Sequence, residues 1–138
     1  MFRMYLGFEI DIKKIYKLKY GRDCRMYGNE IIFEGREDEE YEDDLFEWFM
    51  ERHKGTIKGT NIRFDSDYDC SGNNHPRTYC VGQCIYNSYN EKEFPSLLDI
   101  NKLNHLSPNV SFALTTILRE LDIVRPDFPR IIPIYSYS

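Results

Sequence analysis

The first twelve residues of this 138-residue chain alternate between apolar and polar side chains, and no other feature constrains the fold as strongly. The apolar residues occupy the even positions: Phe2, Met4, Leu6, Phe8, Ile10 and Ile12. A period of two puts the apolar side chains of an extended segment on one side. The segment is therefore predicted to be a half-buried strand.

A helical spacing replaces the alternation at residue 12. Ile12, Ile15 and Tyr16 would share one helix face, with Asp11 as the N-terminal cap and Gly21 as the C-terminal cap. We expect a short helix here. A hairpin over the same residues is the alternative.

Two longer helices are predicted further along the chain. The first runs from about Glu39 to Lys54 and carries one apolar stripe, made of Tyr41, Leu45, Trp48 and Phe49. The second begins at Ser107-Pro108, where a capping residue is followed by proline at the first helical position. A shorter helix is predicted before it, over residues 97–106.

Further strands are predicted over residues 29–35, 61–68 and 78–86, so strands and helices intermix without regular alternation. This order predicts a single α+β domain over residues 1–124, with a three- to five-stranded, mostly antiparallel sheet and helices on one face. Residues 125–138 form a proline-rich tail. Its prolines exclude a helix and disfavour a central strand, so we expect an extended segment packed on the domain or on a partner subunit.

The composition limits the class of protein. Hydrophobic residues make up 41% of the chain, which excludes a disordered protein. No apolar stretch approaches the ~20 residues that cross a bilayer, and no secretory signal precedes the first strand. We therefore expect a cytoplasmic or host-intracellular protein. A single alanine among many Ile, Asn, Tyr and Phe residues points to an AT-rich source such as a microbe, a parasite or a large virus.

The charge is distributed unevenly. Residues 34–47 hold nine acids and one base, a net charge of −8, so the remainder carries +3 of the overall −5. Residues 1–27 carry seven bases and three acids. The chain thus combines a basic amino-terminal part with an acidic belt.

Four residues have side chains that zinc prefers: Cys70, His75, Cys80 and Cys84. Their spacing differs from that of known zinc knuckles. On a regular strand Cys80 and Cys84 would lie roughly 13 Å apart, too far for one ion unless Gly82 forms a bulge. The alternative is that these cysteines are free thiols, buried as small apolar groups.

Three carboxylates at alternate positions, Asp65, Asp67 and Asp69, would point to one side of a strand end. Such an array suits magnesium or calcium, and it would support a metal-dependent enzyme acting on a phosphate-containing substrate. The alternative is a solvated strand end. The three histidines, His53, His75 and His105, have no recognisable orienting partner, so no catalytic residue is predicted.

The basic amino-terminal segment is a candidate nucleic-acid surface. Its bases interleave with Tyr16, Tyr20 and Tyr27, which could stack on unpaired bases. The bases are Lys13, Lys14, Lys17, Lys19, Arg22 and Arg25. The acidic belt disfavours this function unless it faces away from them.

The acidic belt is a candidate surface for a basic protein partner. Its central acids are Glu37, Asp38, Glu39, Glu40, Asp43 and Asp44. Because no strong catalytic motif is present, the leading hypothesis is a non-enzymatic accessory or regulatory protein, of viral type, that binds another protein or forms a homodimer. The metal-dependent enzyme and the nucleic-acid binder are the alternatives.

Overall fold

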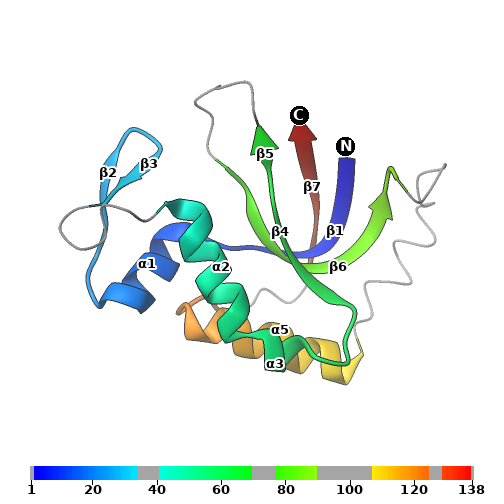
Figure 1. Ribbon diagram of the computed structural model, residues 1–138. Helices are drawn as coiled ribbons and strands as arrows, with labels where there is room; N and C mark the ends of the chain where they lie inside the picture. Colours follow the sequence, from blue (N-terminus) through cyan, green and yellow to red (C-terminus); the bar gives the residue numbers. More distant parts are fainter. Residues whose placement is uncertain (1, 34–40, 70–76, 90–106, 125–128, 138) are drawn as a thin grey trace.

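The computed structural model describes residues 2–33, 41–69, 77–89, 107–124 and 129–137 (Figure 1). Its elements are β1 (Phe2–Glu9), α1 (Ile12–Tyr20), β2 (Arg25–Tyr27), β3 (Glu30–Ile32), α2 (Glu42–Arg52), α3 (Lys54–Ile57), β4 (Ile62–Ser66), β5 (Tyr68–Asp69), β6 (Tyr79–Asn87), α5 (Pro108–Glu120) and β7 (Arg130–Tyr137). The predicted α+β class, with a mostly antiparallel sheet and helices on one face, is confirmed.

The main sheet has the strand order β4-β6-β1-β7-β5. β6 and β7 both pair antiparallel with β1, and β4 pairs antiparallel with β6. Only the short pairing of β5 with β7 is parallel. β2 and β3 form a separate two-stranded hairpin.

Gly7 of β1 and Gly82 of β6 face each other in the sheet. A Cβ atom added to Gly7 would lie 2.1 Å from the carbonyl oxygen of Val81, and one added to Gly82 would lie 2.5 Å from that of Leu6. Real Cβ atoms do not come this close to backbone. Glycine is therefore required at both positions for the two backbones to approach.

The two edges of the sheet come together at one end. β5 begins only two residues after β4 ends, yet β4 pairs with β6 whereas β5 pairs with β7. Asp67, the residue between them, accepts a hydrogen bond from the backbone nitrogen of Tyr135 at 3.0 Å. The enclosed face of the sheet carries a small core of its own, made of Tyr5, Cys80, Ile132 and Ile134.

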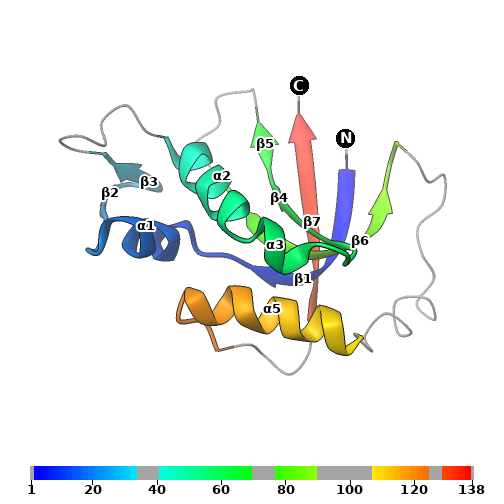
Figure 2. The ribbon, with the colours of Figure 1, turned by 60° about the horizontal axis from the view of Figure 1, so that its bottom comes forward.

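The larger core lies on the other face of the sheet, beneath the helices. In Figure 2, α2 and α5 both lie in front of the sheet, and side chains of both enter this core. Leu45 and Phe49 of α2 and Leu114 and Ile117 of α5 are completely buried there. Rings of Phe46 and Phe49 contact sheet aromatics edge-on, so this face is filled chiefly by aromatic and branched side chains.

The helix predicted after the first strand is confirmed, and the alternative hairpin is wrong. The Asp11 carboxylate accepts a hydrogen bond from the Lys13 backbone nitrogen at 2.9 Å. Gly21 ends α1 in the left-handed conformation, with φ of 71°. Ile15 and Tyr16 are buried, as the spacing predicts.

The helix predicted from about Glu39 corresponds to α2 and the short α3. Leu45 and Phe49 are buried as expected, but Tyr41 precedes the helix and its side chain is 72% exposed. Phe46 takes its place in the core. The helix that begins with the Ser107 cap is also confirmed, as α5. The helix predicted over residues 97–106 lies outside the described residues.

Residues 130–137 of the predicted extended tail form β7, which lies between β1 and β5 although its prolines disfavour a central strand. The Tyr135 nitrogen points away from β1, toward Asp67. Residues two apart in a strand direct their nitrogens the same way, so the Pro133 nitrogen also points away from β1. On that side β7 pairs with β5 only at Ser136 and Tyr137. The missing N–H group of Pro133 therefore removes no hydrogen bond from that pairing.

Candidate functional site

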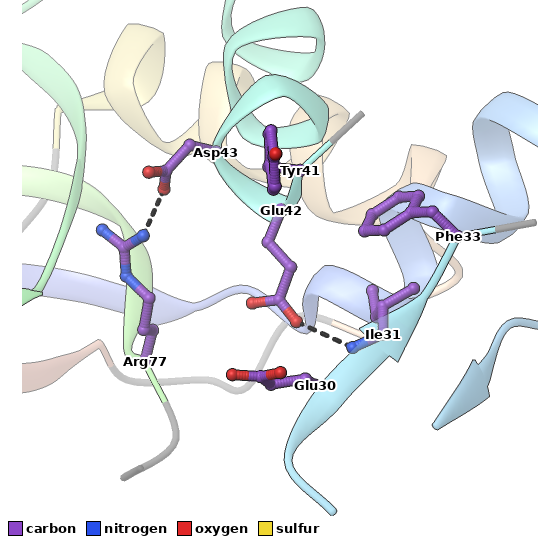
Figure 3. Close-up of a pocket in the computed structure, with 7 residues that line it drawn as sticks. All are labelled: Glu30, Ile31, Phe33, Tyr41, Glu42, Asp43 and Arg77. Atoms are coloured by element: carbon purple, nitrogen blue, oxygen red, sulfur yellow. Dashed lines mark hydrogen bonds and ion pairs between the residues drawn. The ribbon is translucent and has the colours of Figure 1, made fainter. Parts of the chain in front are cut away.

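A groove of about 560 Å³ separates the β2–β3 hairpin from the start of α2 (Figure 3). Glu30, Ile31 and Phe33 form one wall. The facing wall is formed by the first residues of α2 with Tyr41, and by Arg77, which precedes β6. The groove therefore combines carboxylates with two aromatic rings at the surface of the molecule.

Glu42 holds the two walls together. Its carboxylate accepts a hydrogen bond from the Ile31 backbone nitrogen at 3.1 Å and another from the Tyr79 hydroxyl at 3.3 Å. Burial, and after it the negative charge of Glu42, raises the pKa of Tyr79, which keeps this hydroxyl a donor. The first turn of α2 is thereby tied to both β3 and β6.

Arg77 is fixed on the opposite side of the groove. Its guanidinium donates to the Asp67 carbonyl oxygen at 2.6 and 3.0 Å and pairs with the Asp43 carboxylate. It also lies over the Tyr79 ring, 5.6 Å from the centroid. Contacts within the protein therefore fix the position of the Arg77 side chain.

The groove carries an excess of negative charge. Glu30, Glu42 and Asp43 line it together with the single base Arg77. Glu30 is exposed and has no ion-pair partner among the described residues. Glu30 and Glu42 both line the groove, and both are drawn in Figure 3.

The predicted acidic belt is only partly described. Asp43 pairs with Arg77, and Asp44 accepts the Tyr41 backbone nitrogen at 2.8 Å at the start of α2. Glu37, Asp38, Glu39 and Glu40 lie outside the described residues. They belong to the connection between Phe33 and Tyr41, both of which line the groove.

Two of the four predicted zinc ligands, Cys80 and Cys84, lie on β6 and differ in exposure. Cys80 is completely buried in the enclosed core, where burial raises the pKa of its thiol, whereas Cys84 is exposed. The β1–β6 pairing is irregular at Ile85, between the partners of Met4 and Tyr5, and not at Gly82. Cys70 and His75 lie outside the described residues.

Two carboxylates of the predicted divalent-ion site have protein partners. Asp65 accepts a hydrogen bond from the Tyr5 hydroxyl at 2.6 Å and forms a two-pronged ion pair with Arg3. Asp67 accepts the Tyr135 nitrogen. The side chain of Asp69 lies outside the described atoms. Within the described residues, no three His, Cys, Asp or Glu side chains are grouped closely enough to hold a metal ion.

Two of the six bases of the basic amino-terminal segment, Lys19 and Arg22, lie over aromatic rings. Tyr16 is buried, and Arg22 lies over both Tyr16 and Tyr20. Lys19 lies between the Tyr20 and Trp48 rings, 5.3 and 5.6 Å from their centroids. Lys13, Lys14, Lys17 and Arg25 lie on α1 and β2, and of the three interleaved tyrosines only Tyr27 is highly exposed.

The basic segment and the acidic belt adjoin each other. Lys13 and Glu42 line the same hollow, next to the groove. A polyanion on α1 would therefore meet the carboxylates of α2, which disfavours nucleic-acid binding.

Sequence reasoning did not find Glu30, Phe33 and Arg77 as site residues. The one sequence feature that could have pointed to the groove is that two aromatic residues, Phe33 and Tyr41, flank the acid-rich connection. Arg77 had no such signal because its place depends on the pairing of β6. His53 lies at the end of α2, and its ring is buried beside Glu120, a partner that the sequence did not indicate.

Comparison with known proteins finds no matching protein family, no matching curated protein and no matching solved structure. Across the described residues, no helix is both long and apolar enough to cross a membrane. The groove therefore has to be interpreted from its own chemistry.

Proposed function

We propose that this protein binds another protein by accepting a lysine- or arginine-bearing segment in the groove between β3 and α2. The observation that carries the proposal is that Glu30, which has no ion-pair partner among the described residues, lines the same open groove as the aromatic side chains of Phe33 and Tyr41. A cation gains from carboxylates and from the faces of aromatic rings, and both are present.

Tyr41 supports this proposal. An aromatic ring that is 72% exposed buries apolar surface only when a partner covers it. Tyrosine and arginine are enriched where protein interfaces derive most of their binding energy. The groove supplies the tyrosine. Because the groove is acidic, it favours a partner that supplies the arginine.

The test is an NMR titration of the full chain with a nine-residue peptide of alternating arginine and serine. We expect saturable shifts in the amides of Ile31 and Phe33, and an affinity that falls as salt rises, because exposed charges are screened. The same peptide with glutamate in place of arginine should not bind.

Glu30→Lys should weaken binding by about fivefold to tenfold, because one attractive charge becomes repulsive. Glu47→Lys is the matched control, since Glu47 is exposed on α2 and does not line the groove. Equal binding by both variants and the wild type would contradict the proposal.

A further inference from the structure

A hollow of about 510 Å³ lies between β4 and the end of α2. It shares no lining residue with the acidic groove between β3 and α2. The last residues of α2, the short α3 and the turn after it form one wall. The other wall is formed by three consecutive residues of β4, Ile62, Arg63 and Phe64. We call this hollow the β4 groove.

The β4 groove follows the open edge of β4. Consecutive side chains of a strand point to opposite faces of the sheet, so a hollow lined by three consecutive residues lies beside the strand and not over one face. Among the described strands, only β6 pairs with β4. The groove therefore lies on the side of β4 that faces away from β6.

The backbone of Phe64 points toward this open side. The Asp67 backbone nitrogen donates to the Thr78 carbonyl oxygen at 3.0 Å, which continues the pairing of β4 with β6. The backbone groups of successive residues in a strand point alternately to its two sides. Phe64 lies three positions before Asp67, so its N–H and C=O groups point away from β6.

Phe64 also provides the free donor of this edge. The backbone nitrogens of Ile62 and Ser66 lie on the same side, but the first donates to the Thr60 hydroxyl at 3.2 Å and the second to the Asp65 carboxylate at 2.8 Å. Within the described residues, the Phe64 nitrogen has no acceptor on this side. An unpaired strand edge of this kind can accept another extended chain as an added strand.

The β4 groove carries an excess of positive charge. Lys54, Lys58 and Arg63 line it together with the single acid Glu51. All four side chains are exposed, and the three bases have no ion-pair partner among the described residues. The groove therefore favours an acidic ligand, although the chain as a whole carries a net charge of −5.

From these observations we propose that the β4 groove binds an acidic, extended segment of another protein, which adds as a strand to the open edge of β4. The free backbone of Phe64 favours a polypeptide over a nucleic acid, because a polypeptide carries both donors and acceptors at the spacing of a strand. This interaction is separate from the proposed function, in which a different groove binds a basic segment.

The test is an NMR titration of the full chain with a nine-residue peptide of alternating glutamate and threonine. We expect saturable binding that weakens as salt rises. The amide proton of Phe64 should move downfield, and its exchange with solvent should slow by about tenfold, because it gains an acceptor. The Arg63 amide, which points toward β6, is the internal control and should change less.

The matched variants are Lys58→Glu and Lys17→Glu, which change the net charge equally. Lys58 lines the β4 groove, whereas Lys17 is exposed on α1 and does not line it. Lys58→Glu should weaken binding by about fivefold, because an attractive charge becomes repulsive. Lys17→Glu should bind the peptide as the wild type does. Circular dichroism verifies that each variant is folded.

Three outcomes would overturn the inference. The first is binding that leaves the Phe64 amide unchanged, or that persists when lysine replaces glutamate in the peptide. The second is tighter binding of single-stranded DNA than of the peptide, again weakened by Lys58→Glu. The third is self-association that Lys58→Glu abolishes, because a second copy would then be the occupant. The proposed function is tested separately, since its test uses a basic peptide and Glu30.

Discussion

Gly7 and Gly82 face each other across β1 and β6, and neither position has room for a Cβ atom. The space is closed by the backbone of the opposite strand, not by a side chain that can move. This contact sets how closely β1 and β6 approach each other. Both faces of the sheet depend on it, since each carries part of the core.

Gly7→Ala should destabilise the protein by about 2–4 kcal/mol, because the added methyl group overlaps backbone that cannot move without breaking the sheet pairing. The free energy of unfolding from urea denaturation measures this. Gly55→Ala is the control: no atom lies within 4 Å of an added Cβ there, so stability should be unchanged or slightly higher. Equal stability of the two variants would show that the close approach is not constrained.

Asp65→Ala should cost about 2–4 kcal/mol, since it leaves the partly buried Arg3 guanidinium without its carboxylate. Tyr5→Phe should cost less, about 1 kcal/mol, because it removes only one hydrogen bond to the same carboxylate. Urea denaturation of both variants gives the two values. A larger loss in Tyr5→Phe than in Asp65→Ala would contradict this ordering.

His53 should make stability fall in mild acid. Its ring is 3% exposed, its Nδ1 lies 3.2 Å from the Thr56 hydroxyl, and its Nε2 lies 3.3 Å from the Glu120 carboxylate without hydrogen-bond alignment. Burial lowers the pKa of His53, an effect that outweighs the raising influence of Glu120, while Arg52 lowers the pKa further.

The sign of the effect follows from the unfolded state. There His53 binds a proton near its ordinary pKa of 6.5, whereas the folded state resists the proton. The stabilising contribution of the neutral ring is therefore complete above that pH and is lost as the pH falls through it. Urea denaturation at several pH values between 5 and 8 measures the slope. His53→Gln should flatten it, and an unchanged slope would show that other groups cause it.

Local signals in the sequence were sufficient for both ends of α1 and for the start of α5. Asp11 and Gly21 bound α1, and Ser107 with Pro108 begins α5, because capping depends on groups within a few residues of the helix end. Tyr41 was misassigned to the stripe of α2 because spacing alone does not say where a helix begins. The acid-rich residues before α2 do not mark the first residue of the helix any more clearly.

The curled sheet could not be predicted from the sequence. It depends on Tyr68 pairing with Ser136, residues far apart in the chain, and on a change of partner between β4 and β5. The candidate site was missed for the same reason. Glu30, Glu42 and Arg77 become neighbours only when the hairpin, α2 and β6 are assembled.

The position of β1 has a consequence for biosynthesis. β1 precedes both of its partners, β6 and β7, in the chain, and the two are synthesised much later than β1. Until residues 130–137 emerge, one edge of this apolar strand has no partner and is open to association with other chains. Because β1 pairs with β7 only late in synthesis, folding is slow. Until then the nascent chain depends on other molecules, such as chaperones, to cover the unpaired edge of β1.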